Sequence, residues 1–204
     1  MKKTFLGIIC TLFIASSVNA ADLTFGVSAS YTMVNASGTE TESTEKTNAS
    51  VSNEVVIGSI FVENNFGNFS LGLDYIPFKA DVSSATKSRA DSNSEGDTGT
   101  NKANAEISNH ITVYALYPFG NGAFIKAGVA QVDVKTKESL NSGSKYGDDT
   151  IYGGQIGIGF GNDNWRLAVE YTDYEQVSLT SSTNSDNKIT ADLDTTAVKL
   201  SYNF

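Results

Sequence analysis

The chain ends with Thr195-Thr196-Ala197-Val198-Lys199-Leu200-Ser201-Tyr202-Asn203-Phe204, in which two classes of residue alternate. Even-numbered positions carry Thr, Val, Leu, Tyr and Phe, whereas odd-numbered positions carry Thr, Ala, Lys, Ser and Asn. Because successive side chains of a β-strand point to opposite faces, the stretch predicts a strand with one apolar and one polar face. It also has the roughly 9–11 residues that a tilted strand needs to cross a bilayer.

The same period of two recurs along the chain. It predicts eight strands, near residues 23–33, 54–63, 69–76, 110–117, 123–134, 151–160, 165–172 and 195–204. The segments 54–63 and 123–134 alternate less clearly, so the pattern leaves open which of their faces is apolar. No convincing amphipathic helix follows the N-terminal segment. We therefore expect an all-β fold.

The connections between these strands alternate in length. Short turns rich in Gly and Asn occupy Asn64–Asn68, Gly120–Gly122 and Gly161–Asn164. Long polar stretches lie near 35–53, 79–106, 135–148 and 176–188. A soluble β-sandwich has no reason to sort its connections in this way. The pattern predicts an eight-stranded antiparallel up-and-down barrel that crosses an outer membrane, with short turns on one side and long loops on the other.

The first twenty residues have the features of a secretory signal peptide. A basic Met1-Lys2-Lys3 start precedes the apolar run Phe5–Ile14 and a small-residue ending at Ala20. A transmembrane anchor is the alternative, but the apolar run is too short for one. We expect a signal peptide at 1–20 and a barrel domain at 21–204. Cleavage would remove two lysines and the sole cysteine, Cys10.

Composition limits the remaining functions. The 14 basic residues face 23 acidic ones, which gives a net charge of −9 and argues against a nucleic-acid partner. One cysteine excludes a disulfide framework and a cysteine-based zinc site. We expect no cofactor and no metal. The mean hydropathy of −0.18 is that of an ordinary soluble protein, so only the arrangement of the residues indicates a membrane.

Aromatic residues fall near the two ends of the expected strands, as in proteins that meet lipid headgroups at both membrane surfaces. Those expected at the periplasmic rim are Phe69, Tyr117, Phe160, Trp165, Tyr202 and Phe204. Those expected at the outer rim are Tyr31, Tyr75, Tyr152 and Tyr171. Outer-membrane lipid and lipopolysaccharide are the partners that this pattern predicts.

The run Asn64–Tyr75 and the ending Leu200-Ser201-Tyr202-Asn203-Phe204 resemble the small outer-membrane β-barrel family. That family includes the opacity-type adhesins and the transmembrane domain of outer membrane protein A. The resemblance covers residues 21–204 and lies in periodicity rather than in a sharp motif. It implies that Leu200, Tyr202 and Phe204 act as the signal that the barrel-assembly machinery reads. It also leads us to expect no periplasmic peptidoglycan-binding domain.

The faces expected to point inward carry a set of polar side chains: Asp74, His110, Lys126, Gln155, Arg166, Glu170 and Lys199. Eight strands enclose little more than side chains, and charges in such a lumen must be paired. We interpret the set as a polar plug. With Trp165 near Phe204, Glu170 would lie opposite Lys199. The alternative interpretation is the selectivity filter of a narrow passive channel.

His110 is the single histidine, and it allows a third interpretation, a lipid-modifying barrel enzyme. Such chemistry would need a carboxylate beside the histidine on the same face, and the sequence places none there. The glycine-rich Gly153–Gly161 resembles a nucleotide-binding loop, but no Lys-Ser/Thr follows it. Inward-facing glycines on a strand explain it better.

Two stretches of the long connections, 38–46 and 87–102, are rich in Ser, Thr, Asn and acidic residues. Few apolar side chains are available to order them, so we expect mobile, solvated loops. Loops are where barrel proteins carry specificity. The sequence therefore predicts a non-enzymatic outer-membrane protein of a Gram-negative-type bacterium, with a role in surface structure and adhesion to an unidentified surface ligand.

Overall fold

The computed structural model describes residues 23–42, 45–83, 87–91 and 99–204. The signal peptide expected at 1–20 lies outside these residues. The described chain consists of strands and their connections: β1 (Leu23–Glu42), β2 (Glu45–Asn65), β3 (Ser70–Ile76), β4 (Ala80–Asp81), β5 (Lys87–Asp91), β6 (Gly99–Pro118), β7 (Ala123–Ser139), β8 (Asp148–Gly161), β9 (Trp165–Tyr174), β10 (Val177–Thr180) and β11 (Lys188–Asn203). Within it, no helix is long and apolar enough to cross a membrane.

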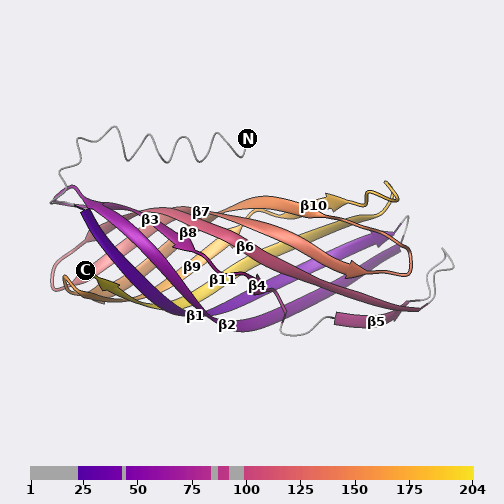
Figure 1. Cartoon of the computed structure of the whole chain (residues 1–204), viewed down its shortest axis with the longest axis horizontal. Helices are drawn as coiled ribbons and strands as arrows, with labels where there is room; N and C mark the ends of the chain where they lie inside the picture. Colours follow the sequence, from indigo (N-terminus) through magenta and orange to yellow (C-terminus); the bar gives the residue numbers. More distant parts are fainter. Residues whose placement is uncertain (1–22, 43–44, 84–86, 92–98) are drawn as a thin grey trace.

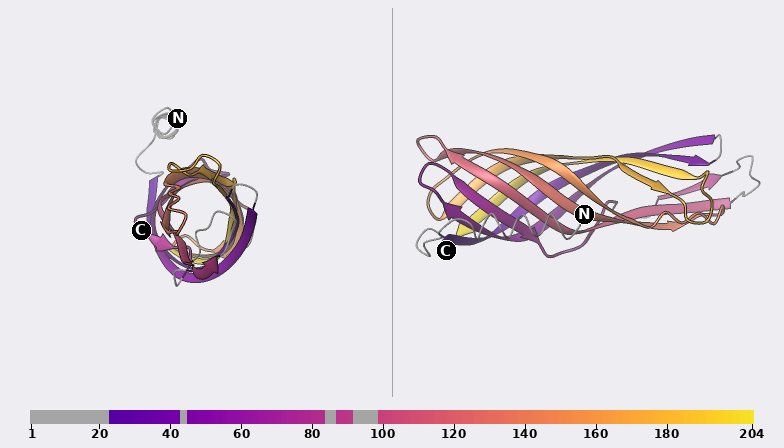
Figure 2. Two further views of the ribbon diagram at one scale, coloured as in Figure 1. Left: turned by 90° about the vertical axis from the view of Figure 1, so that its right-hand side faces the viewer. Right: turned by 90° about the horizontal axis from the view of Figure 1, so that it is seen from above.

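The strands close into a barrel, as the end-on view of Figure 2 shows. Neighbouring strands are antiparallel in the order β1-β2-β3-β6-β7-β8-β9-β11, and β11 pairs with β1 to complete the ring. The short strands β4 and β5 pair with the part of β6 that extends past β3. In the same way, β10 pairs with the part of β11 that extends past β9. The wall of the barrel therefore consists of eight strand positions, with β4, β5 and β10 as extensions of three of them. This confirms the predicted eight-stranded up-and-down barrel (Figure 1).

The predicted pairing between β9 and β11 was wrong by two residues. Trp165 lies opposite Tyr202, not Phe204, and Glu170 consequently lies opposite Ala197. Lys199 is opposite Ala168. A shift of two residues keeps every side chain on its predicted face, because the facing of a strand has a period of two. The alternation alone cannot distinguish these registers.

Two of the expected long loops, 35–53 and 79–106, are largely β-structure in their described residues. β1, β2 and β6 contain 20, 21 and 20 residues, about twice the 9–11 that a membrane crossing needs. Residues 38–41 pair with both β2 and β11, and β5 pairs with β6. The prediction of mobile loops at 38–46 and 87–102 was therefore wrong for the described residues. For residues 38–41, ladder hydrogen bonds on both sides of the strand order it without many apolar side chains of its own.

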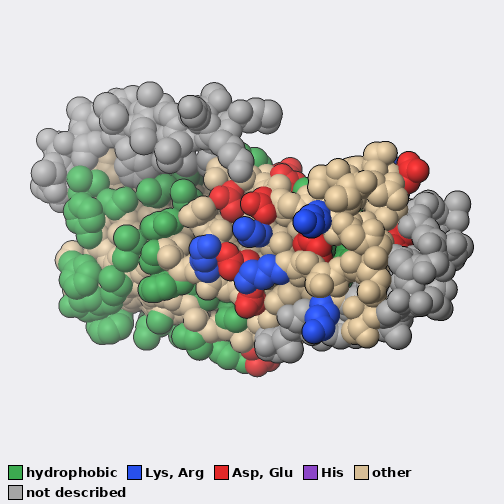
Figure 3. Space-filling model, turned by 45° about the vertical axis from the view of Figure 1, so that its right-hand side comes forward, with side chains coloured by type: hydrophobic (Ala, Val, Ile, Leu, Met, Phe, Trp, Pro, Cys, Tyr) green, Lys and Arg blue, Asp and Glu red, His purple; other side chains and the backbone are tan. Residues whose placement is uncertain are grey.

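The outside of the barrel divides into two halves. We call residues 23–33, 54–78, 110–131, 151–172 and 195–204 the belt half. Every large apolar side chain that is exposed in the described chain lies there. Beyond it, the projecting half carries polar and charged residues on its outer surface. Figure 3 shows apolar side chains gathered over one end, a group of charged side chains near the middle, and mostly uncharged polar surface beyond it.

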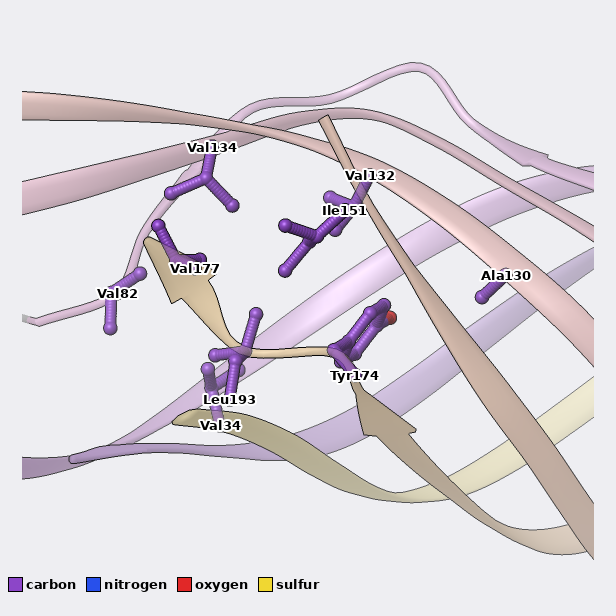
Figure 4. Close-up of a cluster of buried hydrophobic side chains, with 9 residues drawn as sticks. All are labelled: Val34, Val82, Ala130, Val132, Val134, Ile151, Tyr174, Val177 and Leu193. Atoms are coloured by element: carbon purple, nitrogen blue, oxygen red, sulfur yellow. The ribbon is translucent and has the colours of Figure 1, made fainter. Parts of the chain in front are cut away.

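The inside has the opposite polarity. In the belt half the interior holds charged residues such as Asp74, Lys126 and Glu170. From the boundary between the two halves into the projecting half, the interior is filled by an apolar cluster that includes Val34, Val132, Ile151, Tyr174 and Leu193 (Figure 4). The belt half is thus apolar outside and mostly polar inside, with a small apolar cluster of Tyr114, Leu116, Phe124 and Ala168 beside the charges. The projecting half is built like a water-soluble β-domain.

Strand β7 shows the reversal within one element. Its outward positions begin with Ile125 and Val129 and continue with Asp133 and Lys135. Its buried positions change from Lys126 to Val132 and Val134 over the same distance. The facing of 123–134, which the sequence left open, follows from this pattern. In β2, Phe61 and Glu63 point inward and Ile60 points outward, which settles 54–63.

Candidate functional site

Six charged side chains meet inside the belt half. They are Glu63, Asp74, Lys126, Arg166, Glu170 and Lys199. Strands β2, β3, β7, β9 and β11 contribute them, so the set forms only when the barrel closes. Three carboxylates face three cations, and the interior of the belt half therefore carries balanced charge.

The part of this network nearer the short turns centres on Arg166. Its guanidinium donates to both carboxylate oxygens of Glu63, each at 2.8 Å, and to Asn203 Oδ1 at 2.7 Å. The Tyr114 hydroxyl donates to Glu63 Oε1 at 2.6 Å. Lys126 Nζ lies 4.0 Å from the centroid of the Tyr114 ring. The two parallel hydrogen bonds between Arg166 and Glu63 fix both the position and the orientation of these two charged groups.

The other part of the network joins two further ion pairs. Lys126 Nζ donates to Glu170 Oε1 at 2.7 Å, and Lys199 Nζ donates to Asp74 Oδ2 at 2.5 Å. Lys199 also lies 4.0 Å from Glu170 Oε2, which links the two pairs. Ser59 donates a hydrogen bond of 3.0 Å to Asp74. Every charge thus has an opposite charge beside it, as burial requires.

Of the residues predicted to form a polar plug, Asp74, Lys126, Gln155, Glu170 and Lys199 are buried. Arg166 is part-buried and pairs with Glu63, and the Gln155 amide nitrogen lies 3.4 Å from Glu170 Oε2 and from Thr172 Oγ1. The structure thus brings six of the seven predicted residues into one cluster. His110 lies apart from the ion pairs, and its Nε2 is 2.9 Å from the Tyr174 hydroxyl.

Sequence reasoning missed two members of the network, Glu63 and Tyr114. Glu63 lies in the segment whose facing the alternation did not settle, so its carboxylate could not be assigned to the lumen. Tyr114 has the same parity as His110 in the expected strand 110–117 and so belongs to its inward face, but an aromatic ring there gives no signal of a plug residue. Its ring is accommodated by Gly72, because a Cβ there would stand only 2.2 Å from Tyr114 Cζ.

The network closes the lumen. The space left among Glu63, Tyr114, Phe124, Arg166 and the surrounding side chains amounts to about 20 Å³. A single water needs about 10–15 Å³ of such volume, so there is no room for a continuous water file. Above the network lies a larger cavity of about 450 Å³, bounded by His110, Gln155, Tyr174 and the apolar cluster.

Among the described residues, no carboxylate forms a hydrogen bond with His110: its Nδ1 has no partner, and its Nε2 is paired with the Tyr174 hydroxyl. No group of three or more His, Cys, Asp or Glu residues that could hold a metal ion occurs among the described residues.

The outer surface of the projecting half carries a second charged cluster, where β4 meets β6 and β7. Glu106 accepts hydrogen bonds of 2.9 Å from Lys79 and Lys137, and Lys137 also contacts Asp81 at 2.9 Å. The hydrogen bonds from Lys137 and Lys79 lower the pKa of Glu106 from 4.5 to about 2. The same contacts to Asp81 and Glu106 raise the pKa of Lys137.

Most aromatic residues predicted to lie at the membrane surfaces are exposed on the belt half. The exposed ones are Tyr31, Phe69, Tyr117, Phe160, Trp165, Tyr171 and Phe204, whereas Tyr75, Tyr152 and Tyr202 are half-buried. Tyr202 packs between Trp165 and Phe204, with ring centroids 4.6 and 5.3 Å away. Exposed aromatics not predicted are Phe25, Phe66, Phe78 and Phe119. Leu200 and Phe204, part of the predicted assembly signal, also face outward.

Two solved structures that share this fold are outer-membrane proteins. The outer membrane protease OmpT from Escherichia coli is 12% identical and has a TM-score of 0.52, with 92% of this chain and 98% of that chain covered. OprG from Pseudomonas aeruginosa is 13% identical with a TM-score of 0.51, covering 89% and 95%. No family model matches the chain, and no curated protein matches it in sequence.

The chain therefore has the fold of an outer-membrane β-barrel. A closed barrel with an apolar belt on its outside requires lipid around that belt. In water, a continuous ring of large apolar side chains would stay exposed to solvent, which is unfavourable. The fold and the belt together place the protein in the outer membrane.

Proposed function

We propose that the protein is a non-enzymatic surface protein whose sealed barrel anchors a rigid β-structured projection outside the cell. The closure of the lumen by the Glu63–Arg166, Asp74–Lys199 and Lys126–Glu170 pairs carries this proposal. A barrel closed by paired charges serves as an anchor rather than as a conduit. The projection of β1, β2 and β6 beyond the belt supplies the surface on which an external partner would bind.

Conductance in planar lipid bilayers tests the sealed lumen. The purified barrel should insert without discrete, reproducible openings, because the space in the network holds about one water. Regular single-channel steps would instead support the narrow passive channel. A variant with Arg166→Ala, which removes the side chain that bridges Glu63 and Asn203, serves as a positive control for conduction through the same lumen.

The adhesion role requires a test of the projection itself. Ala36 pairs with Val51, so replacement of residues 37–50 by a short turn would shorten the β1–β2 hairpin while leaving the belt half intact. Cells displaying the shortened protein should lose attachment to biotic or abiotic surfaces relative to cells displaying equal amounts of the complete protein. Unchanged attachment would contradict a role of this hairpin in adhesion.

The enzyme alternative centres on His110, which contacts a tyrosine hydroxyl rather than a carboxylate. We propose that His110 has a structural role in the lumen. Its replacement in His110→Ala should leave the lipid A composition of the host cell unchanged, as measured by mass spectrometry. A change in lipid A that depends on His110 would contradict the non-enzymatic assignment.

A further inference from the structure

The barrel wall has a lateral interruption beside β2. β2 pairs with β3 only from Ile60 to Asn65. In the described part of the chain, no backbone pairing joins residues 45–59 to β4, β5 or β6. β3 ends at Ile76, and Pro77 follows, which has no N–H to continue the ladder. β4 then pairs with β6 alone, so no backbone ladder joins β2 to β4 (Figure 1), and Asn53 Nδ2 of β2 donates to the Asp81 carbonyl of β4 at 3.3 Å across this interruption.

The cavity above the charged network reaches this interruption. One lip is formed by Val55, Val56 and Ile57 of β2, and the other by Ile76 and Phe78. Val56 lines the cavity although its side chain is 79% exposed on the outside of the barrel. The cavity is therefore open sideways through the wall. Val56 pairs with Tyr31, so the mouth lies at the edge of the apolar belt.

The interior of the cavity combines an apolar wall with a polar floor. Its upper wall includes Val34, Ile107, Val132 and Leu193. The floor contains Gln155, whose side-chain Oε1 forms no hydrogen bond although the residue is 94% buried, and His110, whose Nδ1 also lacks a partner. Buried polar atoms without partners are uncommon in folded proteins. Both residues line the cavity, so a hydroxyl group bound beside them would supply the missing partners.

Charge and size limit what this molecule can be. The charged side chains that line the cavity, Asp74, Lys79, Asp81, Glu170 and Lys199, are each already paired with an opposite charge, so a charged ligand would be buried without compensation. A cavity of about 450 Å³ is within the range of small-molecule sites, about 300–1,000 Å³. A hydroxyl group can donate to Gln155 Oε1 and can either donate to or accept from His110 Nδ1.

We propose that this cavity binds a small, neutral, amphipathic alcohol or phenol, taken up sideways from the membrane. The hydroxyl end contacts the floor at Gln155 and His110, and the hydrocarbon body lies against the apolar wall and points toward the mouth between β2 and Phe78. The sealed network below the floor makes this a binding site rather than a passage to the periplasm. The site is independent of the adhesion role.

Binding can be measured with two probes that differ only in the hydroxyl, 4-hexylphenol and hexylbenzene. Isothermal titration calorimetry would use the folded barrel in lipid nanodiscs, with empty nanodiscs as the blank. We expect saturable binding of about one 4-hexylphenol per chain and about three- to tenfold weaker binding of hexylbenzene, as for the loss of one hydrogen bond. Gln155→Leu should reduce the difference between the probes.

A matched pair of variants locates the site. Ala197 lines the cavity, whereas Ala127 is exposed on the lipid face. Ala197→Trp should weaken 4-hexylphenol binding at least tenfold, and Ala127→Trp should leave it unchanged; heat-modifiable gel migration would confirm that both variants are folded. Should Ala197→Trp prove unfolded, Gln155→Leu decides the outcome alone. Absence of saturable binding, equal binding of both probes, or equal binding by folded Ala197→Trp would overturn the proposal.

Discussion

At the scale of single residues, the Glu63–Arg166 ion pair is the contact in the lumen with the strictest requirements for burial and hydrogen-bond geometry. The side chains of Glu63 and Arg166 are 7% and 13% exposed, and each has further hydrogen-bonding partners. Their sequence separation explains why the pair could not be predicted, because contact between them depends on the complete ring. The inward-facing charges of the clearly alternating strands, by contrast, were predictable from the period of two.

Removal of one partner from this pair should be costly. Glu63→Leu would leave the Arg166 guanidinium buried without a carboxylate, and we expect a loss of about 3–5 kcal/mol in the free energy of unfolding. Urea unfolding of the barrel in detergent micelles, followed by Trp165 fluorescence, would measure it. The double variant Glu63→Leu/Arg166→Met should recover most of the loss. A double variant as unstable as Glu63→Leu would contradict the pairing.

The packing of Tyr114 leads to a second prediction at the same scale. A Cβ at Gly72 would lie 2.2 Å from Tyr114 Cζ, whereas none of the protein's atoms lies within 4 Å of a Cβ placed at Gly154. Gly72→Ala should therefore lower the free energy of unfolding by about 1–3 kcal/mol, the usual effect of overpacking. Gly154→Ala should change it little in the same urea titration. Similar values for the two variants would show that Tyr114 does not occupy this position.

At the scale of elements, the sequence was informative about which face of a strand is apolar and uninformative about how far the strand continues. Residues 38–41 of β1 carry Gly, Thr and Glu, which favour a solvated loop. They form a strand because β2 and β11 supply backbone partners on both sides. Such partners are far away in the sequence, and composition does not reveal them. The register of β9 on β11 was missed for a related reason, since facing is unchanged by a shift of two.

The lipid face of β11 gives a prediction for one strand. Val198 is exposed on the belt, and Ala197 faces the lumen. Val198→Lys should cost about 2–4 kcal/mol if the position lies near the bilayer midplane, and Ala197→Ser should be mild. Reversible unfolding in lipid vesicles would provide both values. Equal tolerance at the two positions would mean that the facing of β11 is wrong.

The ion-pair cluster that joins β4 to β6 and β7 should make the projecting half sensitive to acid. Because the pKa of Glu106 falls from 4.5 to about 2 on folding, its contribution to stability is present above pH 4.5 and is lost as the pH falls toward 2. The stability difference between the unmodified protein and Glu106→Gln should therefore shrink over that interval, as measured by urea unfolding. Lys137→Met should weaken this pH dependence. A difference that is constant from pH 6 to pH 2 would contradict the cluster.

At the scale of the whole molecule, the central feature is a barrel whose polarity reverses along its axis. The sequence predicted the belt half well, because lipid imposes a simple alternation on each strand. It did not predict the projecting half, where buried residues such as Val82, Tyr146 and Val177 come from segments that look like polar connections. The cavity between the two halves was equally unpredictable, since its walls come from many strands and its mouth depends on a pairing that β2 does not make.

Spin labels at outward-facing positions of β7, in protein inserted into lipid vesicles, test the reversal of polarity along the barrel axis most directly. Labels at Ile125 and Val129 should collide with oxygen, which dissolves in the bilayer, and labels at Asp133 and Lys135 should collide with a water-soluble nickel complex. The crossover should fall between Val129 and Asp133, where the outward residues change from apolar to charged. Preferential access of the nickel complex at Ile125 and Val129, or of oxygen at all four positions, would contradict a barrel embedded only by its belt half.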